Sequence, residues 1–469
     1  MKVRPPLKLF LLTVMFSLTY SFSGLLDDYG RGKNNVPEGT SGLTEDDALF
    51  LTPYIEKGQI EKGQNLAKVP TILKNIESFA GFITVNKSTD SNLFFWLFKS
   101  QQGDWKKKPL VIWLQGGPGG SSMFGLFTEL GPFSVTKGQK LKRRKYSWHQ
   151  KYNLVFIDNP VGAGFSFTKK DSGYATDETD VARDLYELLV QLHKLFPSLQ
   201  SNKLFVTGES YAGKYIPAIA YKIHKENKAS TFKINLAGLM IGNAFTDPIN
   251  IMTYSTYLYK LGLIDKATEN DFKKREDEIR ALIRSGQFIS AASKWDREMD
   301  EFQYLSGLRG FYDFVNDDIG NDGPEIYYIN DAETRKNIHV GSYTFQNGYA
   351  TYEHLQGDMF QSVRPWVEEL LTAEEFPIMF YSGQLDIIVA YPLSLGFYDA
   401  LEWPHASQYH KANRCQFKVG NDVAGYYKTA GTFTEVLVRN TGHMVPTTQP
   451  KWAFELLDRF ITNSSSFVC

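Results

Sequence analysis

Cysteine is nearly absent from this chain, which has two, Cys415 and Cys469, in 469 residues. At most one disulfide can form, and the sequence does not say whether it does, so the fold cannot rest on a network of bridges. Charge of one sign is also lacking: 51 Lys and Arg balance 52 Asp and Glu, for a formal net charge of −1. This balance, with no long basic run, argues against nucleic acid as a partner. No histidine stands at a metal-ligand spacing from a cysteine or an acid, so no metal site is expected.

Long hydrophobic runs are missing as well. The apolar run Leu9 to Leu18 is too short to cross a bilayer, and no later run approaches the length of a spanning helix. Three basic residues precede this run, and small residues follow it before Gly24, which is the layout of a signal peptide over residues 1–23. An uncleaved anchor is the alternative. Residues 24–48 are polar and Gly-rich, and we expect them to form a flexible segment or a propeptide.

A signal peptide predicts entry into the secretory pathway, with an extracellular or lysosome-like destination. Two glycosylation sequons agree with that route, at Asn86 and at Asn463. Asn86 lies between two strand-like segments, and this position makes it the better candidate of the two.

The most informative motif is the hexapeptide Gly208 to Gly213, which reads Gly-Glu-Ser-Tyr-Ala-Gly. It follows the apolar run Leu204 to Thr207 and precedes a helix-like stretch from Lys214 to Lys225. A strand, a sharp turn with small residues and a helix form a nucleophile elbow, which would expose the hydroxyl of Ser210 above a sheet. Taken alone, the hexapeptide fits an ordinary Gly/Ser turn equally well.

Two later residues supply what a serine nucleophile needs, a base and a carboxylate that orients the base. Asp386 follows the buried-strand pattern Phe376 to Tyr381, and His443 follows the strand-like run Val436 to Val438, before a final helix. Serine, aspartate and histidine in this order, each after a strand, are typical of α/β-hydrolases. The pattern predicts a catalytic triad of Ser210, Asp386 and His443.

A glycine-rich loop, Gln115 to Ser122, follows the strand-like run Leu110 to Trp113. In this layout such a loop builds half of an oxyanion hole, and the residue after the nucleophile supplies the other donor. We therefore expect the backbone N–H groups of Gly117 and Tyr211 to hold the oxyanion. A phosphate-binding loop is disfavoured because no Gly-Lys-Ser/Thr sequence follows.

Taken together, the motifs resemble those of the serine carboxypeptidase family over most of the chain, from about residue 50 to residue 465. The family pattern Asn-Gly-Gly-Pro-Gly-Cys-Ser-Ser is altered here, with Gln115 in place of Asn and Gly120 in place of Cys. This altered version is most similar to the vitellogenic-like carboxypeptidase branch. The motifs that carry the resemblance are Gln115 to Ser122, Glu129 to Pro132, Ile157 to Ser166, Gly208 to Gly213, Ile241 to Asn243 and Gly442 to Pro446.

The resemblance implies hydrolysis of the C-terminal peptide bond of peptides and proteins at acidic pH, through an acyl-enzyme and without a cofactor or metal. It also implies a site for the substrate's terminal carboxylate, at Gln115, Glu129 and Glu209. Two clustered carboxyls cannot both ionise cheaply, so at mildly acidic pH one retains a proton and can donate to that carboxylate. Met444 either borders the pocket for the leaving residue or packs as an ordinary loop methionine. Similar enzymes include dimers, so a homodimer is one expected state, and no stable membrane anchor is expected.

The expected fold class is α/β, an α/β-hydrolase fold with a doubly wound, mainly parallel sheet and an inserted helical cap. Residues 49–250 would form the first part of the core, 251–350 the cap and 351–469 the second part of the core. The segment Asp180 to Leu195 carries one apolar helical face, and Glu269 to Arg284 is a charged, helix-like run in the expected cap.

Two rival functions fit the same residues. An acyltransferase or esterase would use the same triad and pass the acyl group to an alcohol, or would cleave an ester. A catalytically silent binding or storage protein would keep the fold without turnover. The Glu129 and Glu209 pair argues against the first rival, because an ester substrate has no free carboxylate to bind there. The intact set of three triad residues argues against the second.

Overall fold

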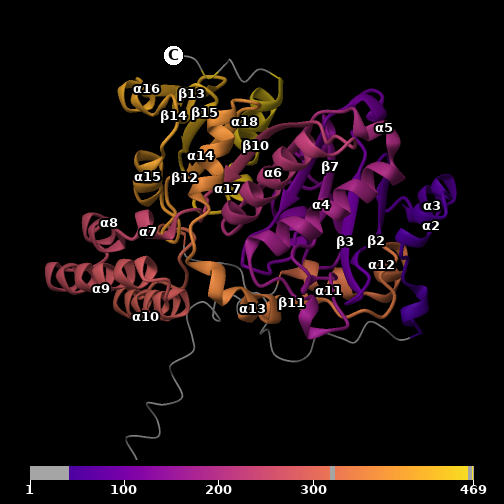
Figure 1. The fold of residues 1–469 in the computed structure, drawn as a ribbon, viewed down its shortest axis with the longest axis horizontal. Coiled ribbons are helices and arrows are strands. Elements are labelled where there is room, and N and C mark those ends of the chain that lie inside the picture. Colours follow the sequence, from indigo (N-terminus) through magenta and orange to yellow (C-terminus); the bar gives the residue numbers. More distant parts are fainter. Residues whose placement is uncertain (1–41, 317–322, 463–466, 468–469) are drawn as a thin grey trace, which may run out of the picture.

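A single large sheet organises the chain in the computed structural model, which describes residues 42–316, 323–462 and 467 (Figure 1). The sheet has eleven strands in the order β1-β2-β3-β7-β4-β9-β10-β12-β15-β14-β13. Its strands are β1 (Lys68–Val69), β2 (Ser78–Asn86), β3 (Ser91–Phe98), β4 (Leu110–Leu114), β7 (Asn153–Ile157), β9 (Leu204–Glu209), β10 (Leu236–Gly242), β12 (Ile378–Gly383), β13 (Cys415–Val419), β14 (Asp422–Ala430) and β15 (Phe433–Val438).

Helices and short segments connect these strands. The small pairs are β5 (Phe133–Val135) with β6 (Leu141–Arg143), and β8 (Ala163–Gly164) with β11 (Gln346–Asn347). The α-helices are α2 (Thr52–Glu56), α3 (Ile60–Ala67), α4 (Glu178–Leu195), α5 (Pro197–Gln200), α6 (Ala212–Ala229), α7 (Pro248–Ile251), α8 (Tyr254–Lys260), α9 (Lys266–Arg284), α10 (Phe288–Ser306), α11 (Pro324–Asn330), α12 (Ala332–Asn337), α13 (Tyr349–Met359), α14 (Arg364–Ala373), α15 (Tyr391–Ala400), α16 (Ala406–Lys411), α17 (Val445–Thr448) and α18 (Pro450–Thr462). The shorter helical segments are η1 (Glu45–Asp47), η2 (Trp105–Lys107), η3 (Gly125–Leu130), η4 (Trp148–Gln150) and η5 (Asp171–Gly173).

The centre of the sheet is parallel and both edges are antiparallel. The strands from β7 through β4, β9, β10 and β12 to β15 all run in one direction, whereas β3 and β14 pair antiparallel to the ends of this set. The carboxyl ends of the central strands therefore meet at one edge of the sheet, where ligands bind in open α/β folds. The expected doubly wound sheet is confirmed.

Helices cover both faces because the buried central strands have two apolar faces. Along β4, Ile112 packs into a core with the apolar faces of α4 and α6, whereas Val111 and Trp113 pack into a second core with α18. Figure 1 shows α4 and α6 lying side by side across the sheet, in agreement with their extensive contact. The predicted apolar face of Asp180 to Leu195 is the buried face of α4, whose first turn is capped by the Asp177 carboxylate.

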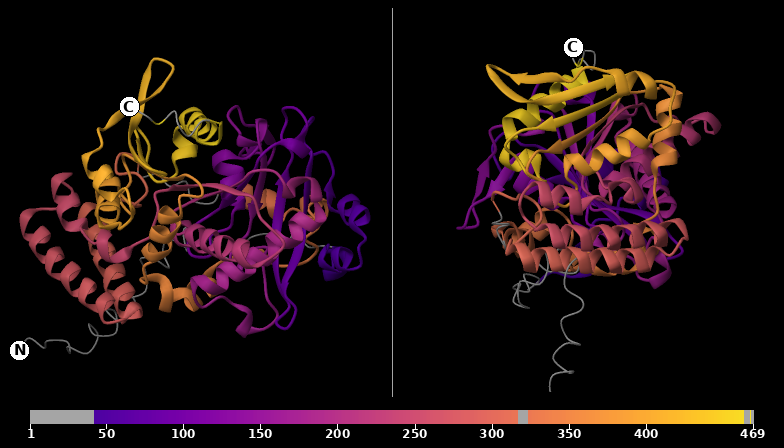
Figure 2. Two further views of the ribbon diagram at one scale, coloured as in Figure 1. Left: turned by 45° about the horizontal axis from the view of Figure 1, so that its top comes forward. Right: turned by 90° about the vertical axis from the view of Figure 1, so that its left-hand side faces the viewer.

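The connection between β10 and β12 carries a group of helices, α7 to α14. Figures 1 and 2 show α8, α9 and α10 together at one side of the molecule, at the opposite end from β2 and β3. The predicted charged helix Glu269 to Arg284 is α9. The division of the chain into core and cap at residues 250 and 350 stays a prediction.

The expected N-terminal segments lie almost wholly outside the described residues. The last few residues of 24–48 are described, and they are folded: η1 is closed by a capping box at Thr44, and Ala48 forms a β-bridge with Val340. Within the described part of the chain, no helix combines the length and the apolar character needed to cross a membrane. Cys415, the first residue of β13, is disulfide-bonded, and Cys469 lies outside the described residues.

Candidate active site

Ser210 lies on the turn between β9 and α6, at the carboxyl edge of the parallel strands. Its backbone φ of 63° is in the left-handed region, which a non-glycine residue adopts only when surrounding contacts hold it there. The Ser210 N–H donates to the Gly242 carbonyl at 2.9 Å, and its carbonyl accepts from Gly213 at 2.8 Å and from Phe245 at 2.9 Å. These contacts fix a strained strand–turn–helix around the serine, which is the geometry of a nucleophile elbow.

Asp386 and His443 are brought together although 57 residues separate them in sequence. Asp386 follows β12 and His443 follows β15, the neighbouring parallel strand, and His443 Nδ1 lies 2.9 Å from Asp386 Oδ2. Both side chains are buried. His443 Nε2 has no hydrogen-bond partner in the described part of the chain, so this nitrogen is available to a serine hydroxyl or a substrate.

The Asp386 carboxylate is fully committed as an acceptor. Besides the imidazole, Asn243 Nδ2 donates to its Oδ2 at 2.7 Å, and the backbone N–H groups of Ile388 and Val389 donate at 3.1 and 3.2 Å. Asn243 in turn accepts from the Gly383 N–H at 3.2 Å. The motif Ile241 to Asn243 carried the family resemblance without a role, and the structure shows that its asparagine fixes the acid.

Residues from the segment between β10 and β12 also hold the loops of Asp386 and His443. The Tyr257 hydroxyl, on α8, donates to the Asp386 carbonyl at 2.7 Å, and the neighbouring Tyr254 hydroxyl donates to Ile388 at 2.7 Å. The His443 N–H donates to the Tyr312 carbonyl at 2.7 Å, and the Tyr312 ring packs on the imidazole with centroids 5.1 Å apart. Sequence reasoning missed these three tyrosines, because nothing in the expected cap indicated which of its aromatic residues face the core.

The glycine-rich loop packs directly on the elbow. A Cβ on Gly116 would lie 2.6 Å from the Tyr211 nitrogen and 2.7 Å from the Ser210 Cβ, so only glycine permits this approach. The N–H groups of Gly117 and Tyr211 donate to no other described residue. Two free N–H groups beside a strained serine are what an oxyanion hole requires.

Asp158, at the end of β7, anchors that loop. Its Oδ1 accepts from the Ser121 hydroxyl at 2.6 Å and from the Ser122 N–H at 3.0 Å, and its Oδ2 accepts from the Phe165 N–H at 2.8 Å. Burial raises the pKa of Asp158 to about 6, while these donors act in the opposite direction. The residue belongs to the motif Ile157 to Ser166, to which sequence reasoning gave no role.

Gln115, Glu129 and Glu209 form a buried polar group next to the elbow. Gln115 Nε2 donates to Glu209 Oε1 at 2.8 Å, and the Trp113 indole N–H donates to Gln115 Oε1 at 2.9 Å, which fixes the orientation of the amide. The Glu129 carboxyl lies within hydrogen-bond reach of both Glu209 and Gln115, so the two carboxyls face each other. Two buried carboxyls that face each other can share a proton, and a polar ligand or water could complete the hydrogen bonds of this group.

The two carboxyls of this group hold protons more tightly than usual. Burial raises the pKa of Glu129 to about 7, and burial together with the charge of Glu129 raises the pKa of Glu209 well above its ordinary value. The pair thus retains a proton at mildly acidic pH and can donate as well as accept.

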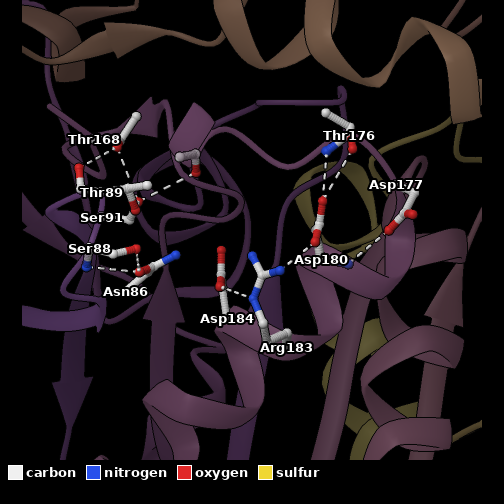
Figure 3. Close-up of polar contacts among 11 residues, drawn as sticks. Asn86, Ser88, Thr89, Ser91, Thr168, Thr176, Asp177, Asp180, Arg183 and Asp184 are labelled. Carbon is white, nitrogen blue, oxygen red and sulfur yellow. Dashed lines mark hydrogen bonds and ion pairs between the residues drawn. The ribbon is translucent and has the colours of Figure 1, made fainter. Parts of the chain in front are cut away.

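The remaining predicted residues are Met444, Asn86 and Asn463. Met444 is half-buried and directly follows His443, and its contact with a leaving residue stays a prediction. Asn86 ends β2, and its Oδ1 accepts from the Ser88 N–H at 3.0 Å and from the Ser88 hydroxyl at 2.7 Å. Figure 3 shows these contacts in one view with the capped first turn of α4. Asn463 lies outside the described residues. Glycosylation at both asparagines stays a prediction.

Known proteins are similar to this chain in sequence and in fold. The family described as serine carboxypeptidase matches residues 70–463. The venom serine carboxypeptidase of Apis mellifera is 44% identical over 97% of this chain and 99% of its own length. The vitellogenic carboxypeptidase of Aedes aegypti is 41% identical over 88% of this chain and 89% of its own length. The probable serine carboxypeptidase CPVL of Homo sapiens is 42% identical over 93% and 94%.

Among solved structures, the prohormone-processing carboxypeptidase Kex1(delta)p of Saccharomyces cerevisiae matches with a TM-score of 0.75 and 26% identity, covering 85% of this chain and 96% of that one. The fold is that of the α/β-hydrolases, as expected from the sequence. Together with the family match over most of the chain, these similarities show that the chain belongs to the serine carboxypeptidase family.

Proposed function

We propose that this protein is a serine-type carboxypeptidase that hydrolyses the C-terminal bond of peptides and proteins at acidic pH. In the first half of the reaction, Ser210 Oγ attacks the scissile carbonyl carbon while His443 Nε2 takes the hydroxyl proton. Asp386 holds the imidazole in the required tautomer and stabilises its cation. The N–H groups of Gly117 and Tyr211 stabilise the oxyanion, and removing one such donor typically costs roughly 10²–10³ in rate.

In the second half, the tetrahedral intermediate collapses and the C–N bond breaks. The proton on His443 Nε2 passes to the leaving amine, so the C-terminal amino acid departs and an acyl-serine ester remains. Water then attacks this ester with His443 again as the base, and Ser210 recovers its proton. No cofactor takes part in these steps.

The observation that carries the choice of a carboxypeptidase is the buried group of Gln115, Glu129 and Glu209, in which Glu209 directly precedes the nucleophile. A terminal carboxylate is an acceptor, so it needs donors, which the Gln115 amide and a protonated carboxyl can supply. Gln115 Nε2 already donates to Glu209, so a substrate would have to share or displace that bond. An ester or an acyl acceptor without a carboxylate gains nothing from this site.

The pKa shifts give the direction of the pH dependence. The pKa of Glu129 is raised to about 7 and that of Glu209 well above its ordinary value, so both carboxyls hold their protons at acidic pH, and the pair begins to lose them as the pH rises through about 7. Once both carboxyls are ionised they repel the substrate carboxylate. Peptide binding should therefore be strong at acidic pH and weaken above about neutral pH.

The decisive experiment compares an N-blocked dipeptide with a free carboxylate and its C-terminal amide, from about pH 4 to about pH 8. We expect release of the C-terminal amino acid from the acid form at low pH, weak cleavage of the amide, and no cleavage by Ser210→Ala. Ser201→Ala, at an exposed serine directly after α5, is the matched control. Absence of cleavage by the folded protein, freed of any propeptide, would favour a transferase or a non-catalytic role.

We further propose that the protein enters the secretory pathway by a signal peptide over residues 1–23 and reaches an extracellular or lysosome-like compartment. Glycosylation at Asn86 and Asn463 would follow from this route.

The homodimer expected from similar enzymes is tested by the molar mass in solution. Met444 is proposed to border the pocket for the leaving residue.

A further inference from the structure

Three residues on adjacent parallel strands stand in register beside the carboxyl pair. Glu209 on β9 pairs with Gly242 on β10, which in turn pairs with Tyr381 on β12. Residues in register on neighbouring strands project from the same face of a sheet. Glu209 and Tyr381 therefore point to one side, and Gly242 between them has no side chain.

The empty position at Gly242 is filled by the ring of Tyr381. A Cβ on Gly242 would lie 2.4 Å from Tyr381 Cζ and 2.5 Å from its hydroxyl oxygen. The tyrosine thus leans across β10 toward β9, and its hydroxyl reaches the side on which Glu209 projects. The glycine of the motif Ile241 to Asn243 is explained by this close approach.

The hydroxyl of Tyr381 is buried and has no hydrogen-bond partner in the described part of the chain. The Glu129 and Glu209 carboxyls lie in the same region, because the charge of each acts on this hydroxyl. A buried phenol without a partner is costly, and a strand residue with a purely structural role would be served as well by phenylalanine. The Tyr381 hydroxyl therefore needs a partner in this region.

The charged groups around the pair come from several elements. The charge of Arg144, just after β6, lowers the pKa of Glu129, and the charge of Asp386 raises the pKa of Glu209. The Gln115 amide donates a hydrogen bond to Glu209. Burial, then the charges of Glu209 and Glu129, raise the pKa of Tyr381 well above its usual value. The phenol accordingly keeps its proton throughout the pH range of interest and can act as a donor.

We propose that Tyr381 is a positioning residue for the Glu129 and Glu209 pair, donating a hydrogen bond to the ionised pair through one water. This inference rests on the proposed function. A donor stabilises the ionised form, so it lowers the pH at which the pair loses its proton. Tyr381 would thereby set the upper pH limit of binding for substrates with a free terminal carboxylate.

The test is Tyr381→Phe, which removes one oxygen and keeps the ring that fills the space over Gly242. We expect the alkaline rise of KM for the N-blocked dipeptide acid to move upward by about one pH unit. The shift should appear for the acid and not for the amide. Tyr409→Phe is the matched control, because Tyr409 is also a buried tyrosine that donates to a buried carboxylate, Glu435 Oε2 at 2.9 Å.

A pH profile of Tyr381→Phe that superimposes on that of the unsubstituted protein, or a downward shift, would overturn the proposal. An equal shift in Tyr409→Phe would also overturn it, because the effect would then be a general one. Glu129→Ala separates this failure from that of the proposed function. If Glu129→Ala leaves the preference for the acid over the amide intact, the carboxylate site itself is wrong, and the role of Tyr381 falls with it.

Discussion

Lys214 should be the residue of α6 whose loss most strongly destabilises the protein. It lies four residues after Ser210 and is fully buried, and its ammonium donates to Asp358 Oδ2 at 2.6 Å. The same ammonium donates to the Asp358 and Met359 carbonyls, so it is satisfied by one short segment at the end of α13. This buried ion pair ties the helix behind the nucleophile to the inserted helices.

Replacement by methionine, Lys214→Met, keeps most of the volume and removes the charge. Breaking a buried pair by removing one partner typically costs about 3–5 kcal/mol, because the remaining charge has no compensation. Two carboxyls would then lack their cation: Asp358, and also Glu178, whose pKa burial raises to about 8 while Lys214 acts to lower it.

The loss of stability should depend on pH. Without Lys214 the folded-state pKa values of Asp358 and Glu178 rise further above their unfolded values. A raised folded-state pKa contributes stability that is fully present below the unfolded pKa and disappears as the pH rises through the folded pKa. The variant should therefore be only mildly destabilised at about pH 5 and should approach the full cost at about pH 7.5.

Urea unfolding followed by tryptophan fluorescence at the two pH values measures this difference. Lys222→Met is the control, since Lys222 is on the same helix and forms a half-exposed pair with Glu226 that should contribute only about 0.3–0.5 kcal/mol. A second variant, Lys214→Met with Asp358→Asn, should recover part of the loss at the higher pH. Equal losses in Lys214→Met and Lys222→Met at both pH values would refute the reasoning.

Two further predictions concern the reaction. Glu129→Ala should lower kcat/KM for the dipeptide acid, relative to that for a small ester, by roughly 10- to 100-fold, because a hydrogen bond to the charged substrate carboxylate is lost. An unchanged acid-to-ester ratio of kcat/KM would contradict the carboxylate site. Asn243→Ala should lower kcat by about 10- to 100-fold by removing a donor to Asp386, while Asn235→Ala, at a surface asparagine, should not. Stopped-assay rates at saturating substrate measure this, and equal rates in both variants would show that Asn243 is not needed to hold the acid.

The core of the site could be predicted because its residues follow strands that are easy to recognise. Ser210, Asp386 and His443 each come within a few residues of the end of a buried strand, and parallel strands bring their carboxyl ends to one edge. Boundaries were less accurate: the run predicted as Phe376 to Tyr381 forms β12 over Ile378–Gly383. Its end depends on pairing with β15 as far as Val438, which the local sequence does not encode.

Other features depend on contacts that no local pattern reveals. In a buried run, Tyr381 is indistinguishable from a core residue until its register with Gly242 and Glu209 is known. The helix α13 has no clear apolar stripe, because one of its buried residues is Asp358, the partner of Lys214. By contrast, α10 buries Trp295, Met299 and Phe302, among others, at helical spacing. This apolar spacing in the sequence is enough to predict the helix.

The catalytic geometry is the joint product of the sheet and the inserted helices. The sheet alone brings Asp386 and His443 to neighbouring strand ends, and Asn243 on the adjacent strand adds a donor. The backbones of both loops, however, are held by hydrogen bonds to Tyr257 and Tyr312, which belong to the insertion. An insertion that only covered the site could be altered with effects on KM alone. Since this one fixes the position of the acid and the base, changes at its tyrosines should alter kcat as well.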